Sequence, residues 1–317
     1  MQPPTLKTVA DWLKAARQQI DALDARLLLQ HVTGASRVDL ICRPDAPLTA
    51  EAAQTLHELL RRRAAGEPLA YLVGTTAFRA RPFKVTPATL TPRPETEELV
   101  DVALAKLAEL SPPSSFAFDA REALTDVGAV CEPPLPSTTH DTLSERRKIL
   151  DMGTGTGVIA ISLALEFPGA QVTACDLSPA ALAVARENAD HLRAPVRFLQ
   201  SDWFSAFADE RFHLIVANPP YIPAADPHLA GDGLSHEPRL ALTDEADGLT
   251  AIRAITAAAL RHLEACGWLL FEHGYDQGET ARHLLAAAGF TQIQTWRDLA
   301  GQERISGGTW TQAAQRA

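Results

Sequence analysis

The sequence predicts an α/β protein in which a doubly wound parallel sheet follows a small N-terminal bundle of helices. Up to about residue 70, apolar residues recur three and four positions apart, as they do on one face of a helix. After Arg147, short apolar runs typical of buried strands alternate with helical segments, an order that builds a parallel sheet through right-handed crossovers. A chain of 317 residues is long enough for two such units, each with its own core.

The composition narrows the classes of function. A net charge of −10 and a pI near 5.5 argue against a protein that neutralises many phosphates, so no direct nucleic-acid partner is expected. The four cysteines have no C-x-x-C spacing, which suggests neither a zinc site nor a disulfide framework, and no metal is expected. The N-terminus lacks a signal peptide, and no apolar window approaches the ~18 residues of a membrane span. We therefore expect no membrane partner and a cytoplasmic location.

Residues 1–72 are predicted to form the helical domain. Gly34 and Gly66 stand just past two of its periodic segments, where glycines commonly end helices. The basic run 61–63 fits two interpretations, cations favoured by the negative end of a helix dipole or a patch that binds a partner. The three segments with helical spacing are "VADWLKAA", "DALDARLLLQHVTG" and "TAEAAQTLHELLRRRAAG".

Residues 73–90 contain short β-prone pieces and are predicted to form a hairpin linker. The main domain is predicted over residues 91–317, and its first helix starts at Pro94 with acids that favour a helix N-terminus. Within it, residues 111–147 are rich in Ser, Pro and Thr without sustained periodicity. We interpret that stretch as a flexible insertion.

The rest of the main domain alternates strands and helices. Ser178 and Pro179 make a favourable N-cap and first position for one of these helices. The expected strands are "KILDMG", "QVTACDL", "VRFLQSD", "FHLIVANPP", "GWLLFEHG" and two more in the tail from residue 290. The expected helices are "VIAISLALEF", "SPAALAVARENADHL", part of "EADGLTAIRAITAAALRHLEA" and "GETARHLLAAAG". Ligands of such sheets bind beyond the carboxyl ends of the strands.

A glycine-rich loop follows the first of these strands. Its spacing, G-x-G-x-G, differs from the G-x-G-x-x-G of dinucleotide folds, and no Lys-Ser/Thr follows to make a phosphate-binding P-loop. Taken alone, it could be only a glycine-rich turn. As a binding loop, it would let a ligand approach the main chain closely. Its residues are Gly153, Thr154, Gly155, Thr156 and Gly157.

Two further residues turn this loop into a candidate nucleoside pocket. Asp176 ends the next strand about 20 residues further on, where an acid can accept both hydroxyls of a ribose. Trp203 ends the strand after that, and its indole ring could stack on adenine, although a core position is also compatible with it. Asp202, beside it, could accept from the adenine amino group or simply cap a turn. A nucleoside pocket without a phosphate anchor suits S-adenosylmethionine as the cofactor.

The tetrapeptide Asn218-Pro219-Pro220-Tyr221 ends the fourth strand and is the candidate catalytic site. The Asn218 side-chain oxygen and the Pro219 carbonyl are two acceptors that could hold both N–H bonds of a planar NH₂ group. Prolines restrict the backbone and would keep these acceptors in place, and the Tyr221 ring could lie against the flat group. An isolated N-P-P-Y could also be a tight turn. Asn218 is placed in the cofactor-binding set as well.

At these residues the chain resembles the N-methyltransferases that act on planar amino groups. Longer segments narrow the resemblance to the protein-(glutamine-N5) methyltransferases of bacterial peptide chain release factors, a class I S-adenosylmethionine-dependent family with a Rossmann-like, seven-stranded domain. It covers nearly the whole chain except residues 111–147. The segments include "GEPLAYLVG", "PRPETE", "NPPYI", "HEPRLALTDEADGL" and "RDLAGQER".

The resemblance implies a substrate and a role for each part. The substrate would be the glutamine of the Gly-Gly-Gln motif in class I release factors, docked by the N-terminal helices. Residues 153–157, Asp176, Trp203 and Asn218 would contact S-adenosylmethionine, and residues 218–221 would hold the glutamine. Arg93 and Glu95 would line the pocket mouth, or serve the start of a helix.

Three alternatives stay open at this point. An N6-adenine DNA methyltransferase could use the same tetrapeptide, but the acidic balance counts against it. A glutamine methyltransferase of a ribosomal protein is a nearer rival, disfavoured by the N-terminal segment. A non-catalytic binding module could retain the fold, although an intact Asn218 and glycine loop argue against it.

Overall fold

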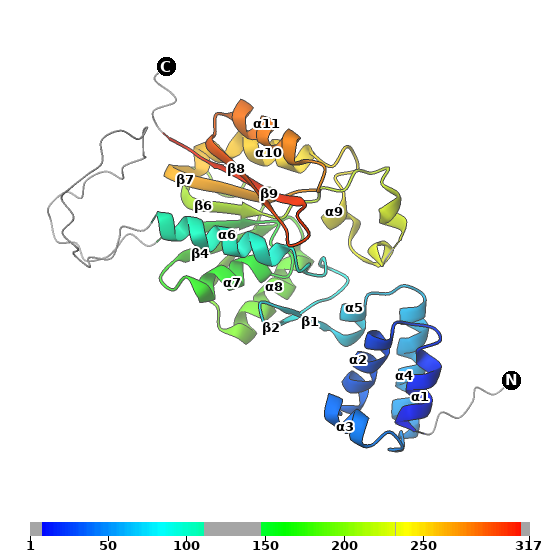
Figure 1. The fold of residues 1–317 in the computed structure, drawn as a ribbon. Coiled ribbons are helices and arrows are strands. Elements are labelled where there is room, and N and C mark those ends of the chain that lie inside the picture. The colour runs from blue at the N-terminus through cyan, green and yellow to red at the C-terminus, as the bar shows by residue number, and fades with distance from the viewer. Residues whose placement is uncertain (1–7, 111–146, 232, 312–317) are drawn as a thin grey trace, which may run out of the picture.

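The computed structural model describes residues 8–110, 147–231 and 233–311, and these form a helical domain, a short hairpin and a larger α/β domain (Figure 1). The helical domain lies beside the hairpin, at one end of the molecule, and the sheet with its helices makes up the rest. The predicted insertion 111–147 lies outside the described residues except for Arg147.

The helical domain contains the three expected helices and two short ones. Its core includes Trp12, Leu28 and Leu56, all at most 1% exposed. Gly34 has φ 68 and ends the second helix in the left-handed conformation, as predicted. The short helices were not predicted because five or six residues are too few to show a period. The elements are α1 (Val9–Ala16), α2 (Ala22–Thr33), α3 (Arg37–Cys42), α4 (Ala50–Ala64) and α5 (Leu69–Val73).

The basic run 61–63 lies in the last turn of α4, where cations interact favourably with the helix dipole. Each of its three arginines also has an acidic partner within the domain. The pairs are Arg61 with Glu58, Arg62 with Glu67, and Arg63 with Asp24. The structure therefore favours the dipole interpretation over a partner-binding patch.

The expected hairpin consists of β1 (Thr75–Phe78) and β2 (Arg81–Lys84), paired antiparallel. Its buried Phe78 and Phe83 belong to the core of the α/β domain. At the turn, the Arg79 guanidinium pairs with Glu166 and with Asp101. The hairpin is thus anchored on the α/β domain rather than on the helices that precede it.

The sheet has seven strands in the order β5-β4-β3-β6-β7-β9-β8. The sequence predicted a parallel sheet, and this is correct for six strands but wrong for β9, which runs antiparallel to both neighbours. The loop 298–302 between β8 and β9 is too short for a crossover, so the chain can only turn back. The strands are β3 (Lys148–Met152), β4 (Gln171–Asp176), β5 (Val196–Gln200), β6 (Phe212–Ala217), β7 (Leu263–Glu272), β8 (Thr291–Arg297) and β9 (Glu303–Thr309).

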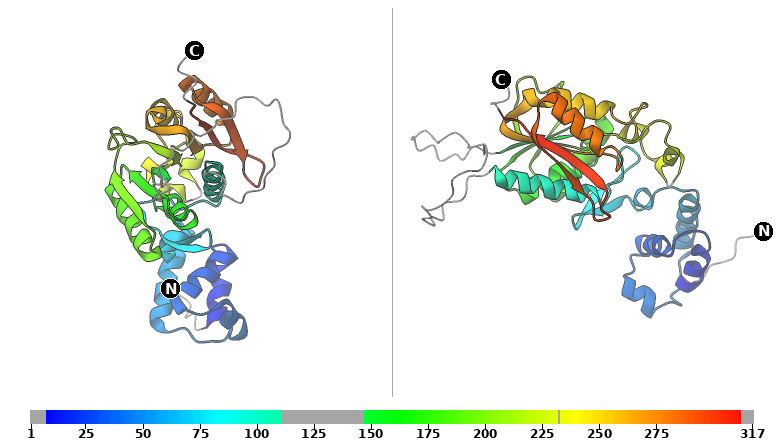
Figure 2. Two further views of the ribbon diagram at one scale, coloured as in Figure 1. Left: turned by 90° about the vertical axis from the view of Figure 1, so that its left-hand side faces the viewer. Right: turned by 45° about the horizontal axis from the view of Figure 1, so that its top comes forward.

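Helices cover both faces of this sheet (Figure 2). Side chains of successive residues in a strand point to opposite faces, so Leu214 belongs to one core cluster and Ile215 to the other. The first cluster lies under α6, α7 and α8, and the second under α10 and α11. These helices are α6 (Thr96–Glu109), α7 (Val158–Glu166), α8 (Pro179–Leu192), α10 (Thr250–Ala259) and α11 (Gly278–Ala288).

Short helical turns occupy the long connection after β6 and the approach to β7. They are η1 (Pro227–Ala230), η2 (Leu234–His236), α9 (Arg239–Leu242) and η3 (Leu260–His262). In the described part of the chain, no helix is both long and apolar enough to span a membrane. The same residues contain no group of three or more His, Cys, Asp or Glu side chains placed to hold a metal ion.

Candidate active site

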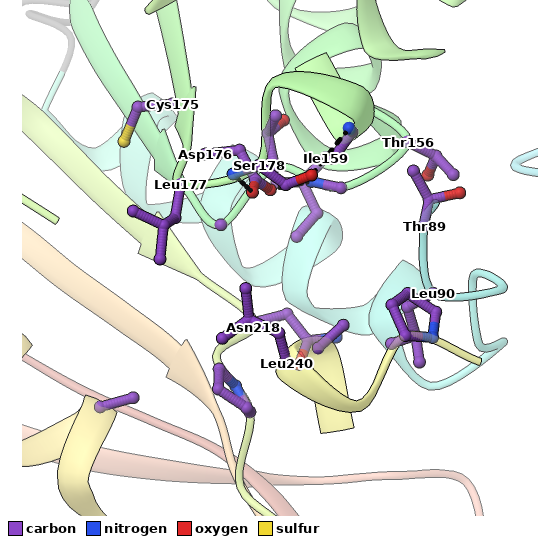
Figure 3. A pocket seen from close by; sticks show the side chains of 18 of the residues that line it. Thr89, Leu90, Thr156, Ile159, Cys175, Asp176, Leu177, Ser178, Asn218 and Leu240 are labelled. Carbon is purple, nitrogen blue, oxygen red and sulfur yellow. Dashed lines mark hydrogen bonds between the residues drawn. The ribbon is translucent and has the colours of Figure 1, made fainter. Parts of the chain in front are cut away.

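A pocket of about 330 Å³ opens at the carboxyl ends of β3, β4, β5 and β6 (Figure 3). Its other walls are the segment 88–96, which leads into α6, and residues of 238–254. In Figure 3, Asp176 and Ser178 lie on one side of the pocket and Asn218 and Leu240 on the other. The site expected from strand order is therefore a single concave space.

The glycine loop forms the floor between β3 and α7. All three of its glycines have positive φ, which explains why other residues would be strained there. Gly153 and Gly155 line the pocket together with Thr154 and Thr156. Gly157 does not line the pocket, and an added Cβ would come within 2.9 Å of Ile161 Cδ1 of α7 and 3.2 Å of Ala185 Cβ of α8.

Asp176 connects β4 to the glycine loop. Its Oδ2 accepts a hydrogen bond from the Gly155 amide at 2.9 Å, and its Oδ1 accepts one from the Ser178 amide at 2.9 Å. Burial raises the pKa of this carboxyl group, while the backbone hydrogen bonds oppose the shift. Each oxygen keeps one acceptor position that is not used by these two amides.

Trp203 lines the pocket after β5, and its neighbour Asp202 lines it too. The tryptophan is half-buried and has φ 45, a left-handed conformation that is uncommon for a bulky residue. Its carbonyl accepts a hydrogen bond from the Ser201 hydroxyl at 2.7 Å. A Cβ on Gly153 would lie 3.9 Å from the indole ring, so the loop and the ring are close neighbours.

The tetrapeptide 218–221 follows β6, but its four residues take different positions. Asn218 and Pro220 line the pocket, whereas Pro219 and Tyr221 do not. The Tyr221 hydroxyl donates a hydrogen bond to Glu272 Oε1 at 3.1 Å. Burial and the nearby Glu272 charge raise the pKa of Tyr221.

Two neighbouring segments contact the backbone carbonyl of Tyr221. An added Cβ on Gly248, which has φ 77, would lie 2.3 Å from the Tyr221 carbonyl oxygen, so that position requires glycine. The Gln277 side-chain amide donates to the same carbonyl at 2.9 Å. These contacts hold the Tyr221 carbonyl between Gly248, in the long connection after β6, and Gln277, just before α11.

A buried network lies next to Asn218. The Asn218 Nδ2 amide donates to Thr96 Oγ1 at 3.1 Å, and the Thr96 hydroxyl donates to Glu272 Oε2 at 2.8 Å. Burial raises the pKa of Glu272, against the hydrogen bonds from Thr96 and Tyr221 and the charge of Arg304, which lower it. Glu272 is 1% exposed and Thr96 is 2% exposed.

Arg93 also lines the pocket. Its guanidinium donates to Glu237 Oε1 at 2.7 Å, and the Thr91 amide donates to Glu237 Oε2 at 3.1 Å. Glu237 therefore ties the segment before α6 to the long connection after β6. Glu95 stands at the N-cap of α6 without a side-chain capping hydrogen bond, and it does not line the pocket.

Known proteins that are similar to this chain show its family. Residues 5–74 match the model of the PrmC N-terminal domain, and residues 135–230 match that of the methyltransferase small domain. The release factor glutamine methyltransferase of Burkholderia pseudomallei (strain K96243) is 46% identical over 312 residues, which cover 96% of this chain and 97% of that protein. The chain belongs to the release factor glutamine methyltransferase family. The family member of Escherichia coli (strain K12) is 39% identical, covering 95% of this chain and 98% of that protein.

A solved structure supports the fold on independent grounds. The crystal structure of the hMettl16 catalytic domain in complex with MAT2A 3'UTR hairpin 6 superimposes with a TM-score of 0.50, covering 82% of each chain. With 11% sequence identity, this likeness concerns the fold alone. Together with the strand order, it confirms the predicted seven-stranded, Rossmann-like class I methyltransferase fold.

For this member of the family, the sequence analysis missed several residues of the site. Asp151 is fully buried, and its Oδ2 accepts from the Thr154 hydroxyl at 2.6 Å and from the Ala160 amide at 3.2 Å. Burial raises its pKa to about 7. An acid two residues before the first glycine of such a loop is a signal that could have identified it. Thr96 and Glu272 carry no local signal, because their role depends on a contact between distant segments.

Proposed function

We propose that this chain transfers a methyl group from S-adenosylmethionine to the N5 amide nitrogen of the glutamine in the Gly-Gly-Gln motif of class I peptide chain release factors. Its relatives over nearly the full length are release factor glutamine methyltransferases. One structural observation supports methyl transfer to an amide. Asn218 holds its amide against Thr96 at the edge of a pocket whose far side carries Asp176, so a planar amide and a nucleoside can lie in one space.

The residues on the β3–β5 side fit the methyl donor. The two acceptor positions left on Asp176 match the two hydroxyls of a ribose. The Trp203 ring is available to an adenine face, and Gly153 and Gly155 leave the main chain accessible to the amino-acid part of the donor. When bound, S-adenosylmethionine supplies an electrophilic methyl group on a sulfonium.

The tetrapeptide 218–221 holds the glutamine in this proposal. An amide nitrogen is a poor nucleophile because its lone pair is delocalised into the carbonyl. Asn218 Oδ1 lies at the pocket and accepts one N–H bond in this proposal. The Pro219 carbonyl accepts the other, although Pro219 itself does not line the pocket, and the two acceptors turn the lone pair toward the donor side. Positioning of this kind can contribute ~7–11 kcal/mol to lowering a barrier. The new N–C bond forms as the S–CH₃ bond breaks, with the electron pair of that bond staying on the sulfur. The nitrogen releases one proton to solvent, and no strong base is needed.

The helical domain docks the release factor in this proposal, since it lies at one end of the molecule next to the hairpin (Figure 1). A cytoplasmic location follows from the substrate, because release factors act on translating ribosomes. Arg93 and the exposed Leu240 lie at the pocket wall where the Gly-Gly-Gln loop would enter.

Mass spectrometry of purified release factor tests the proposal. After incubation with the enzyme and S-adenosylmethionine, we expect the mass of one methyl group on the Gly-Gly-Gln peptide. A release factor with alanine in place of that glutamine serves as the matched control. Methyl transfer to DNA or to a ribosomal protein, with none to release factor, would contradict the proposed substrate. Failure of the chain to bind the donor in calorimetry would support a non-catalytic module instead.

A further inference from the structure

Glu272 is a buried carboxylate that does not line the pocket, yet it lies two hydrogen bonds away from Asn218. Its two oxygens have different partners, the Thr96 hydroxyl on Oε2 and the Tyr221 hydroxyl on Oε1. The network joins three distant segments. Thr96 starts α6, Asn218 follows β6 and Glu272 ends β7. Such an arrangement needs an explanation, because burying a carboxylate is costly.

The direction of each hydrogen bond follows from the donors available. The Thr96 hydroxyl donates its proton to Glu272 Oε2 at 2.8 Å, while the other Glu272 oxygen accepts from the Tyr221 hydroxyl. The Thr96 oxygen then offers only lone pairs to Asn218. Asn218 must therefore present its NH₂ group to Thr96, as observed, and its Oδ1 lies on the other side of the amide plane. The opposite orientation would place two oxygens together without a proton between them.

This orientation matters for the reaction. Rotation of an asparagine amide by a half turn costs little by itself, because its terminal torsion is broad and nearly two-fold. Among the described residues, Thr96 is the hydrogen-bond partner of the Asn218 side chain. Without it, the NH₂ group could face the substrate and repel the N–H bonds that Oδ1 is needed to accept.

We propose that Thr96 and Glu272 are positioning residues that fix which end of the Asn218 amide faces the substrate, with Glu272 Oε2 as the acceptor that sets the direction of the Thr96 hydroxyl. The inference rests on the proposed function for its consequence in catalysis. The orientation of the amide itself does not depend on the identity of the substrate and can be tested separately.

Three substitutions separate the parts of this network. Thr96→Val has nearly the same shape but lacks the hydroxyl, whereas Thr96→Ser retains it. Glu272→Gln places an amide NH₂ group, which donates, where an oxygen now accepts from Thr96, so the Thr96 hydroxyl can turn toward Asn218. Thr256→Val is the matched control, because Thr256 is also a buried helical threonine, is hydrogen-bonded to the Ile252 carbonyl and does not line the pocket.

The first test needs no substrate. The chain contains two asparagines, Asn188 and Asn218, so protein labelled with ¹⁵N in asparagine gives two pairs of side-chain NH₂ signals. Asn188 is an internal reference, since its amide is held by the Lys84 and Thr156 carbonyls. We expect Thr96→Val and Glu272→Gln to shift the Asn218 pair and speed its exchange with solvent. Asn188 should not change, and Thr96→Ser should restore the wild-type signals.

The second test measures turnover on release factor. We expect Thr96→Val to lower kcat roughly three- to tenfold, the range for loss of one neutral hydrogen bond, with KM for the donor unchanged. Thr96→Ser should recover the rate. In an Asn218→Ala background, Thr96→Val should have no further effect, because it acts through Asn218.

The outcomes are distinguishable. An Asn218 signal that does not respond to Thr96→Val, or an equal response of Asn188, would overturn the inference. The inference would also be overturned if Thr96→Val lowered kcat by the same factor in wild type and in the Asn218→Ala background. If the signals respond as expected but wild-type protein does not methylate release factor, the orientation network stands and the proposed substrate fails.

Discussion

The Asp176 carboxylate accepts a hydrogen bond from the Gly155 amide at 2.9 Å, which links the end of β4 to the glycine loop after β3. One carboxylate thus holds the loop and faces the pocket. Asp176→Asn keeps the shape but removes the charge and one acceptor. We expect donor affinity to fall by about 1.5–3 kcal/mol, the range for hydrogen bonds to a charged group. Isothermal calorimetry measures the loss, and the exposed Asp190 on α8 provides an Asp→Asn control. Unchanged affinity would contradict the assigned role.

Asn218→Ala tests the tetrapeptide. The substitution removes the side-chain acceptor that we assign to the glutamine amide, so most turnover should be lost, on the order of 10²-fold in kcat as for other preorganised hydrogen-bond partners. The fold should remain, since Asn218 contacts the pocket and is not part of a core cluster. Circular dichroism verifies the fold beside the kinetics. Turnover near wild type would refute the role.

Gly157→Ala tests whether the third glycine serves packing rather than ligand contact. The alanine would have φ near 84, and its Cβ would come within 2.9 Å of Ile161 Cδ1. We expect a loss of about 2–4 kcal/mol in the free energy of unfolding from strain and overpacking together. Gly169→Ala is the matched control, because Gly169 has φ 95 but open space around it. If both variants lost the same free energy of unfolding in urea, backbone strain alone would explain the effect and packing around Gly157 would not contribute.

The buried Asp151 predicts a pH dependence of stability. Its pKa in the folded protein is about 7, above the ordinary value of 3.8, so the folded state holds a proton that the unfolded chain releases. Its contribution to stability is therefore fully present below pH 4 and is lost as the pH rises to about 7. The loss amounts to at most about 4 kcal/mol. Asp151→Asn cannot titrate and should lack this slope.

Urea unfolding of donor-free wild type and Asp151→Asn between pH 4 and pH 8 measures the difference. We expect the free energy of unfolding of the wild type to fall relative to the variant across this range. Parallel curves would show that the carboxyl group titrates normally. Asp190→Asn controls for the loss of one negative charge at an exposed position.

Much of the fold could be predicted from local pattern. The predicted α1 coincides with the observed helix, and Ser178 caps α8 as expected, its hydroxyl accepting from the Ala181 amide. Periodicity and caps act over a few residues, so the sequence alone can reveal them. The reversed β9 was missed because strand direction depends on which strand is its neighbour. The short α3 was missed because its six residues are too few to show a period, although a Ser36–Asp39 capping box starts it.

The sequence by itself determined the family and the order of the site, since the glycine loop, Asp176, Trp203 and Asn218 each follow a strand, and parallel strands bring their carboxyl ends to one edge. Tertiary structure alone decided what orients Asn218. Thr96 lies 122 residues from Asn218 and 176 from Glu272, and no local pattern relates them. Their hydrogen bonds form only because the start of α6 lies beside the ends of β6 and β7. A hydrogen bond extends about 3 Å in space and imposes no limit on separation along the chain.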